Sequence, residues 1–291
     1  MPHPTASVRQ ITPRSRPRIL AIANQKGGVG KTTTAINLGT ALAAVEQRVL
    51  LIDFDPQGNA STGLGIDRAR RRLNSYSILM DGLPFEQAVL PTGIPGLEVV
   101  AASLDLTGAE LELVASPRRE YHLHDAFATA NVPYDYILID CPPALGLLTL
   151  NALVAADAVL VPLQVEFYAL EGLSHLLGTI ERVKRSFNAR LELQGIVLTM
   201  FDKRNSLSEM IAQDVRGHLG DKVYSTVIPR NVRVSEAPSH GKPVLLYDLR
   251  CTGAQAYLHL AGEILRREGI FPASGASTQS SANADPVRAR A

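Results

Sequence analysis

Short apolar runs alternate with segments of helical periodicity from about residue 18 to residue 267. The apolar runs have the length and continuity of buried strands. They are Arg18–Asn24, Arg48–Asp53, Tyr136–Asp140, Ala158–Leu163, Leu193–Met200 and Lys222–Ile228. The segments with apolar residues at helical spacing predict helices. These are Lys31–Val45, Leu145–Ala155, Ala169–Phe187, Leu207–Leu219 and Gly253–Arg267.

This alternation predicts an α/β fold with three layers, in which a mostly parallel, twisted sheet is covered by helices on both faces. Ligands of such folds bind beyond the carboxyl ends of the strands. Because nothing in the composition marks a second unit and no internal repeat is present, we expect a single domain over residues 18–271. Residues 1–17, which are basic, and residues 272–291 are polar and lack periodicity, and this predicts two disordered tails.

Composition narrows the classes of partner. The 291 residues carry a formal net charge of +1, so any basic surface for nucleic acid must be local. No continuous apolar stretch approaches the length of a membrane-spanning helix, and the N-terminus lacks the apolar stretch of a signal peptide. The two cysteines, Cys141 and Cys251, have no metal-type spacing. We therefore expect a cytoplasmic protein with no membrane contact.

A glycine-rich segment, KGGVGKTT, lies between the first expected strand and the first expected helix. Glycines let successive N–H groups turn toward phosphate oxygens, and the helix that follows adds the positive end of its dipole. In this arrangement Lys31 reaches the β- and γ-phosphates and the Thr32 hydroxyl coordinates Mg²⁺. The predicted nucleotide-binding residues are Lys26, Gly27, Gly28, Val29, Gly30, Lys31, Thr32 and Thr33. The segment therefore predicts a P-loop NTPase that binds MgATP.

Carboxylates end two other expected strands. Asp53 and Asp55 follow one apolar run, and a carboxylate there can orient the water that attacks the γ-phosphate. The alternative is a turn that Asp55 merely caps, and both roles are compatible. Asp140 ends another run and has the Walker B pattern of a magnesium-binding carboxylate. The prolines after Cys141 would stiffen the loop that follows.

The phosphate loop departs from the pattern G-x-x-x-x-G-K-[ST] because Gln25 replaces the first glycine, and it gains a second lysine, Lys26. Since Lys31 already serves the phosphates of its own subunit, Lys26 could point toward a facing copy. Here the sequence resembles the deviant Walker A group of P-loop ATPases, which includes ParA/Soj, MinD and the nitrogenase iron protein. The resemblance implies an ATP-dependent homodimer in which Lys26 contacts the partner's nucleotide, with Lys26, Lys31 and the water-orienting Asp55 as catalytic residues.

The nitrogenase iron protein binds an iron–sulfur cluster through cysteines, so Cys141 is a candidate ligand. Cys251 is far along the chain and outside any recognisable cluster spacing. Cys141 is better interpreted as a small buried hydrophobic residue.

The second half of the chain resembles the chromosomal ParA/Soj type. The resemblance rests on four segments: Cys141–Thr149, Tyr168–Leu173, Leu198–Arg204 and Val227–Pro243. It implies that Pro229 and Asn231 line the adenine pocket and that Arg204 and Arg233 bind double-stranded DNA non-specifically in the ATP dimer. Basic residues in loops can make such sequence-independent phosphate contacts, although without the resemblance these would be ordinary solvated charges.

The resemblance further implies a slow ATP hydrolase on the nucleoid, stimulated by a ParB-type centromere-binding partner in chromosome or plasmid partitioning. Three alternatives stay open. The first is a MinD-like membrane-associated ATPase, although residues 268–291 have one short apolar cluster and no helical repeat of the large apolar residues that a lipid-binding helix needs. The second is a copy-number or organelle-positioning ATPase of the same group. The third is a small-molecule kinase, for which the sequence offers no acceptor-site signature.

Overall fold

The computed structural model describes residues 16–130, 133–166 and 169–271, so both expected tails lie outside the described residues apart from Arg16 and Pro17. One eight-stranded sheet runs through this part of the chain, in the order β3-β4-β2-β5-β1-β6-β7-β8. Its strands are β1 (Arg18–Ile22), β2 (Val49–Asp53), β3 (Val89–Pro91), β4 (Leu97–Val100), β5 (Tyr136–Asp140), β6 (Ala158–Gln164), β7 (Glu192–Phe201) and β8 (Val223–Pro229). All neighbouring strands are parallel except the pair β3–β4 at one edge.

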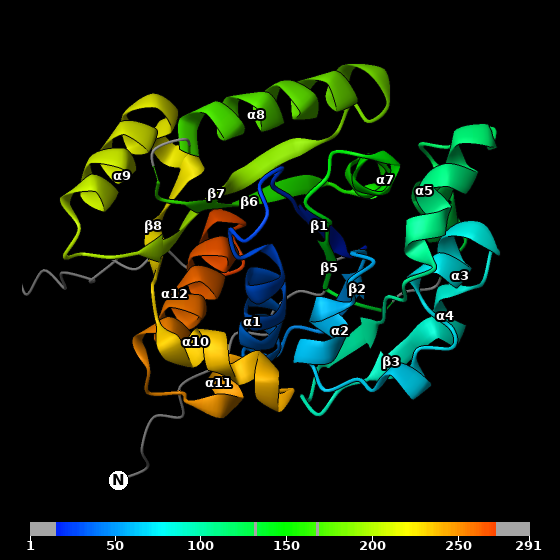
Figure 1. The fold of residues 1–291 in the computed structure, drawn as a ribbon, viewed down its shortest axis with the longest axis horizontal. Helices are drawn as coiled ribbons and strands as arrows, with labels where there is room; N and C mark the ends of the chain where they lie inside the picture. Colours follow the sequence, from blue (N-terminus) through cyan, green and yellow to red (C-terminus); the bar gives the residue numbers. More distant parts are fainter. Residues whose placement is uncertain (1–15, 131–132, 167–168, 272–291) are drawn as a thin grey trace, which may run out of the picture.

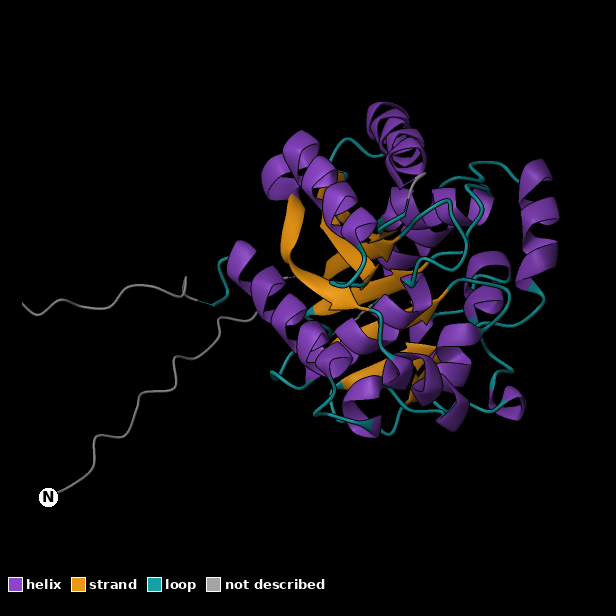
Figure 2. Cartoon of the chain, turned by 60° about the vertical axis from the view of Figure 1, so that its left-hand side comes forward, coloured by secondary structure: helices purple, strands orange, loops and turns teal. Residues whose placement is uncertain are grey.

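Helices cover both faces of the sheet (Figures 1 and 2). One face packs against α1 (Lys31–Ala43), α2 (Asn59–Gly63), α10 (Val232–Glu236), α11 (Val244–Tyr247) and α12 (Thr252–Arg267). The other packs against α3 (Ser75–Met80), α4 (Phe85–Ala88), α5 (Leu106–Ala115), α6 (His122–Thr129), α7 (Leu147–Ala155), α8 (Ala169–Ser186) and α9 (Ser206–Leu219). Short 3₁₀ turns are η1 (Arg68–Arg70), η2 (Gly220–Lys222) and η3 (Ala237–His240). None of the described helices is long and apolar enough to cross a membrane.

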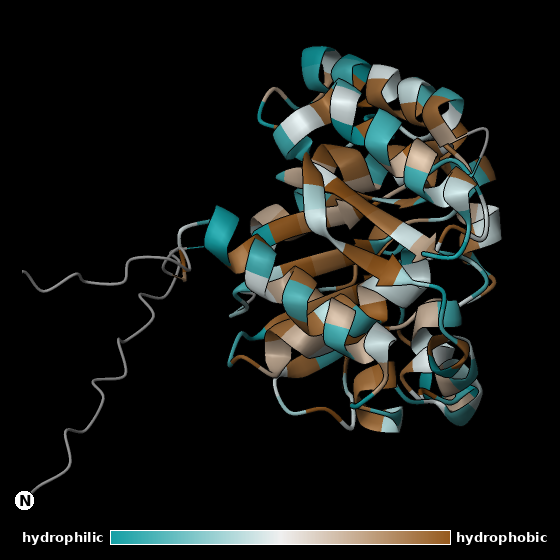
Figure 3. Cartoon of the chain, turned by 90° about the vertical axis from the view of Figure 1, so that its left-hand side faces the viewer, coloured by the Kyte–Doolittle hydropathy of each residue, from teal (hydrophilic) through white to brown (hydrophobic). Residues whose placement is uncertain are grey.

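The central strands are apolar on both sides because each side contacts its own layer of helices. In β1, Ile19 and Ala21 belong to one core cluster, whereas Leu20 and Ile22 belong to the other. Figure 3 shows the consequence, with hydrophobic strands in the middle and hydrophilic helix surfaces outside. Burial on both faces explains why these strands read as continuous apolar runs in the sequence.

The fold class predicted from the sequence is confirmed. Each of the predicted strands and helices is present within a few residues of its expected ends. The pattern missed the elements between residues 59 and 129, together with α10 and α11. Most of them are too short to establish a period, whereas α5 and α6, with 10 and 8 residues, were missed although they are about as long as α7. The pattern also missed the β3–β4 edge pair, where Pro91 is tolerated because an edge strand needs no partner for every N–H group.

A buried carboxylate attaches α12 to the edge strand β8. Glu263 accepts hydrogen bonds from the backbone N–H groups of Ser225 at 2.8 Å and Thr226 at 2.9 Å. The Arg267 guanidinium, one turn further along α12, donates to the same carboxylate at 2.9 Å. Although burial opposes it, these hydrogen bonds leave the pKa of Glu263 below its usual value. The strand that carries Pro229 is therefore tied to a helix of the core.

Replacing Glu263 with alanine should lower the free energy of unfolding by about 3 kcal/mol, because two strand N–H groups and one guanidinium lose a charged acceptor. Urea denaturation measures the change. Glu181→Ala, which removes an exposed glutamate from α8, is the control and should cost less than about 0.5 kcal/mol. Equal free energies of unfolding for the two variants would show that the hydrogen bonds of Glu263 contribute nothing to stability.

Candidate nucleotide-binding site

Parallel pairing brings three loops to the same edge of the sheet. In the register of the strands, Asp140 at the end of β5 lies beside Asp53 of β2 on one side and Ile22 of β1 on the other. The glycine-rich loop follows β1, so it emerges between the loops that follow β5 and β6. The predicted phosphate loop and the predicted carboxylates therefore meet, although they are up to about a hundred residues apart in sequence.

The loop backbone has the conformation that its glycines permit. Gly28 and Gly30 have φ values of 76° and 89°, which residues with a side chain rarely adopt. The Thr199 hydroxyl, from β7, donates a hydrogen bond to the Val29 carbonyl at 2.8 Å and fixes the middle of the loop. At its start, the Lys26 N–H donates to the Asn24 side chain at 3.0 Å. The loop is thus anchored at both points before any phosphate binds.

Lys31 lies under this loop and is only 6% exposed. Its ammonium donates to the Lys26 carbonyl at 3.0 Å, so the side chain runs back toward the start of the loop. Burial lowers the pKa of Lys31, while the nearby carboxylates of Asp140 and Asp55 act in the opposite direction. A positive charge held among these groups is placed to meet phosphate oxygens entering the loop.

Asp53 and Asp55 have different surroundings. Asp53 is fully buried and accepts hydrogen bonds from the Ser61 N–H at 2.7 Å and the Ser61 hydroxyl at 2.6 Å. Burial raises the pKa of Asp53 to about 6, and the bonds from Ser61 only partly offset it. Asp55 is 8% exposed, and its Oδ1 accepts from the Gln57 N–H at 2.9 Å. Asp53 therefore holds α2 in place, and Asp55 retains an oxygen, Oδ2, that no described residue hydrogen-bonds.

Asp140 is buried, and neither of its carboxylate oxygens has a hydrogen-bond partner among the described residues. Burial and the neighbouring Asp53 charge raise its pKa well above the usual value, and the Thr32 side chain and Lys31 only partly counteract this. A buried carboxylate without a partner is costly unless a cation compensates it. The donor set of one carboxylate and one hydroxyl, Asp140 and Thr32, fits a magnesium ion that also binds phosphate oxygens and water.

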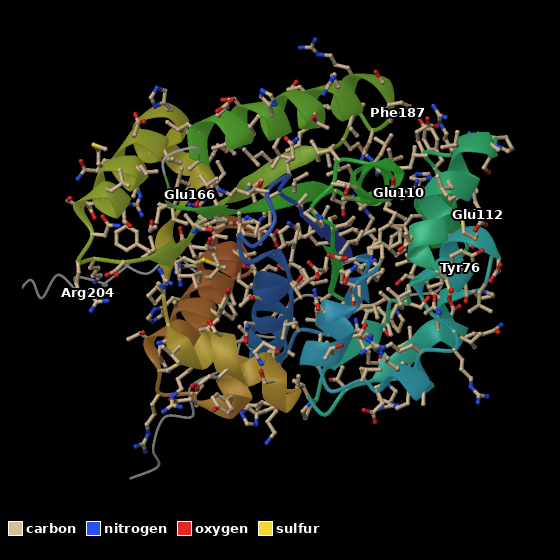
Figure 4. All side chains as sticks on the ribbon, viewed as in Figure 1. Tyr76, Glu110, Glu112, Glu166, Phe187 and Arg204 are labelled. Atoms are coloured by element: carbon tan, nitrogen blue, oxygen red, sulfur yellow. The ribbon has the colours of Figure 1, made fainter. Side chains whose placement is uncertain are left out.

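Lys26 has a partner in its own chain. Its ammonium forms an ion pair with Glu166, which follows β6, and its side chain remains 49% exposed. Figure 4 shows Glu166 where the strand layer meets the end of α8. The lysine expected to reach a facing copy must therefore exchange Glu166 for the partner's phosphate.

A pocket of about 410 Å³ adjoins the glycine-rich loop. Pro229 and Asn231 both line it, and so do Gly30 and Thr33 of the loop. Asn231 also caps α10, because its side chain accepts from the Arg233 N–H at 2.9 Å and donates to the Thr252 hydroxyl at 3.0 Å. The two residues predicted to contact adenine therefore share one cavity with the phosphate loop.

The predicted DNA-binding arginines lie near the same end of the sheet. Arg204 follows β7, extends outward in Figure 4, and forms an ion pair with Asp202 at 3.1 Å. Arg233 lies on α10 and pairs with Glu236 at 2.9 Å and Asp248 at 3.7 Å. Both arginines are exposed, and both are already ion-paired within the chain.

Several residues that shape the site were not singled out in the sequence. Thr199 fixes the loop and Ser61 holds Asp53. Glu110 of α5 accepts from the Leu148 N–H at 3.0 Å and so caps α7, the helix that follows the Asp140 loop. A methyl group on Gly146 would collide with this carboxylate. These roles depend on contacts between distant segments, and only a structure reveals them.

The two cysteines have different surroundings, and neither belongs to a metal-binding group of described residues. Cys141 is fully buried, and burial raises the pKa of its thiol. Cys251 is at the start of α12, where its sulfur accepts from the Ala254 N–H. No group of three or more metal-ligating side chains occurs in the part of the chain that the structure describes.

The three-layer fold and its glycine-rich loop at the end of β1 define a P-loop NTPase. A family model described as an AAA domain matches residues 17–193. The chain is 66% identical over 253 residues to the chromosome partitioning protein ParA of Caulobacter vibrioides, covering 86% of this chain and 95% of the relative. It is 53% identical over 247 residues to the sporulation initiation inhibitor protein Soj of Bacillus subtilis, covering 85% and 98%.

The chain therefore belongs to the ParA/Soj family of chromosome-partitioning ATPases. Solved structures agree with this assignment. A Mycobacterium smegmatis cobyrinic acid a,c-diamide synthase with bound ADP and magnesium has a TM-score of 0.76 and 37% identity, covering 87% of this chain and 96% of that one. The Pyrococcus horikoshii septum site-determining protein MinD, complexed with Mg-ADP, has a TM-score of 0.72 and 28% identity, covering 88% and 98%.

Asp140→Asn should raise the melting temperature of the protein in the absence of nucleotide and magnesium, because it removes a buried carboxyl group that has no hydrogen-bond partner and whose ionisation burial disfavours. The same change at Asp53 should give a lower melting temperature than Asp140→Asn, since the Asp53 carboxylate accepts two hydrogen bonds from Ser61 that the substitution disturbs. Differential scanning calorimetry at pH 7 compares the two variants. A melting temperature of Asp140→Asn below that of the wild type would contradict this description of Asp140.

Proposed function

We propose that the chain is a MgATP-dependent switch that dimerises, binds DNA without sequence preference, and hydrolyses ATP slowly until a ParB-type partner stimulates it. The observation that carries the proposal is the convergence of the glycine-rich loop, Asp55 and the partnerless Asp140 carboxylate at one edge of the sheet. Family membership supports the partitioning role, and two similar structures that contain ADP and magnesium support the cofactors.

The geometry supports the following role for each residue. Lys31 and the backbone of Lys26–Thr33 bind the triphosphate, and Thr32 with Asp140 holds the magnesium ion. A magnesium ion held by these two residues would offset the charge of the phosphates and of the buried Asp140. Asp55 orients the attacking water with its free oxygen, and the positive charge of Lys31 stabilises the negative charge on the phosphates. Pro229 and Asn231 contact the adenine in the adjoining pocket.

The second lysine makes the switch dimeric. Lys26 is half-exposed and pairs with Glu166, so it can leave the surface of its own subunit at modest cost. In the dimer it exchanges that carboxylate for the partner's triphosphate, which carries more negative charge. Two copies then present Arg204 and Arg233 together, and DNA affinity follows the monomer–dimer equilibrium.

Such a protein works in the cytoplasm on the nucleoid. The expected lack of membrane contact stays a prediction, because residues 272–291 lie outside the described residues.

Asp55→Ala should leave ATP binding within about twofold of the wild type and reduce the rate of hydrolysis by about a hundredfold or more, because only the orientation of the water is lost. Phosphate release and fluorescent-nucleotide titration measure the two quantities. Asp81→Ala, which removes an exposed aspartate after α3, should change neither. Normal hydrolysis by Asp55→Ala would assign the water to another residue.

Arg233→Glu should weaken DNA binding about tenfold or more at moderate salt while leaving ATP binding intact, because it replaces a phosphate-contacting cation with an anion. Fluorescence anisotropy with a labelled duplex and a non-hydrolysable ATP analogue measures the affinity. Arg266→Glu on the exposed end of α12 provides the same charge change elsewhere. If both variants bind DNA like the wild type, Arg233 does not belong to the DNA-binding surface.

A further inference from the structure

A run of arginines lies between α2 and α3. This segment contains none of the residues assigned to the ATP site and neither of the two arginines expected to bind DNA. The segment Asp67–Arg72 contains four arginines and a single acidic residue. Arg68, Arg70 and Arg72 are exposed, and the segment forms the 3₁₀ turn η1 and the residues that follow it. The chain is nearly neutral overall, so this is a strong local concentration of positive charge.

These three exposed arginines differ from Arg204 and Arg233 in their pairing. None of them forms an ion pair with a carboxylate of the described residues, whereas Arg204 and Arg233 do. Arg70 makes one long hydrogen bond, 3.5 Å, to the Pro91 carbonyl at the sheet edge. Their guanidinium groups can therefore bind an anion without first breaking an internal ion pair.

The fourth arginine fixes the segment in position. Arg71 is 9% exposed and points inward. Its guanidinium donates to the carbonyl of Ile66 at 2.6 Å, to the Thr62 hydroxyl at 2.9 Å and to the Gly58 carbonyl at 3.3 Å. Burial lowers the pKa of Arg71, which is the cost of placing the cation there. The three arginines around it are thus presented outward by a rigid turn.

Arg71 also connects the segment to the nucleotide site. Gly58 has a φ of 63° and ends the turn that begins at Asp55, whose carbonyl accepts from the Gly58 N–H at 2.9 Å. A methyl group on Gly58 would collide with the Arg71 guanidinium. A shift of the loop after Asp55 must therefore be accommodated by Arg71 and by the turn that holds the exposed arginines.

The arginine segment adjoins the region that carries Arg233. A methyl group built on Gly65, three residues before Arg68, lies 3.0 Å from the Gly241 carbonyl, and the exposed Lys242 comes next in the chain. Figure 1 shows α2 beside the α10–α11 segment, in agreement with the contacts between α2 and η3. The two basic segments are thus neighbours in the structure.

We propose that Arg68, Arg70 and Arg72 form a second surface that binds the phosphate backbone of double-stranded DNA, next to the surface around Arg233. This inference rests on the proposed DNA-binding function. Arginine is suited to such contacts because its planar guanidinium donates two parallel hydrogen bonds to a phosphate. Backbone contacts carry no sequence information, so the surface increases affinity for any duplex.

The triple variant Arg68→Gln, Arg70→Gln, Arg72→Gln tests the inference in the full chain. DNA affinity is measured by fluorescence anisotropy over a range of salt concentrations, with magnesium and a non-hydrolysable ATP analogue. Each phosphate contact that is lost should reduce the slope of log K against log salt by about 0.9. We expect a clearly reduced slope and affinity at least about tenfold weaker at moderate salt.

The matched control is Arg182→Gln, Arg185→Gln, Arg190→Gln, which removes three exposed arginines from the end of α8 and the loop after it. Its slope and affinity should equal those of the wild type. The single variants Arg68→Gln and Arg72→Gln repeat the test should the triple variant not fold, and each should reduce the slope by up to about 0.9.

The outcomes separate this inference from the proposed function. If the wild type binds DNA with the analogue and the triple variant keeps its slope and affinity, the inference is wrong and the function stands. If the wild type does not bind DNA at all, both fail. A triple variant that keeps DNA binding but loses binding to vesicles containing phosphatidylglycerol would overturn the inference and assign the surface to an anionic membrane.

Discussion

The parallel pairing of β2, β5 and β1 is the constraint on which the site depends. It places Asp53, Asp140 and the end of β1 side by side, and the glycine-rich loop begins at Lys26, four residues beyond that end. A shift of one residue in this register would turn Asp140 toward the opposite face of the sheet and would also misplace its apolar neighbours. The same buried apolar contacts that stabilise the sheet therefore hold the nucleotide-binding groups in position.

The ends of these strands hold charge that the fold alone does not require. Asp140 has no hydrogen-bond partner in the described part of the chain, Lys31 is nearly buried, and the pKa values of both are shifted in the direction that disfavours their charged forms. Such groups reduce the stability of the empty protein, and they persist where a ligand restores the balance. A magnesium ion beside Asp140 and a triphosphate above Lys31 would each supply the missing opposite charge.

How much the sequence could predict depended on how local each signal is. The buried strands and long helices were predictable because their apolar pattern extends over many residues. The site residues Lys31, Asp55 and Asp140 were predictable because each lies in a recognisable motif at or after the end of such a strand. The segment from α2 to α6 was not predicted, because most of its elements have only a few residues and therefore no measurable period. Thr199, Ser61 and Arg71 act through contacts with distant segments. The pairing of Lys26 with Glu166 depends on the strand order, which the alternating pattern does not specify.

The central claim is that two chains close over their nucleotides because each contributes a lysine to the other. Light scattering of full-length Asp55→Ala with saturating MgATP tests it most directly, because that variant should bind nucleotide without consuming it. The account predicts the mass of a dimer, and a monomer when Lys26→Gln is added while nucleotide remains bound. A monomeric Asp55→Ala protein with nucleotide bound, or a dimer that persists without Lys26, would contradict it.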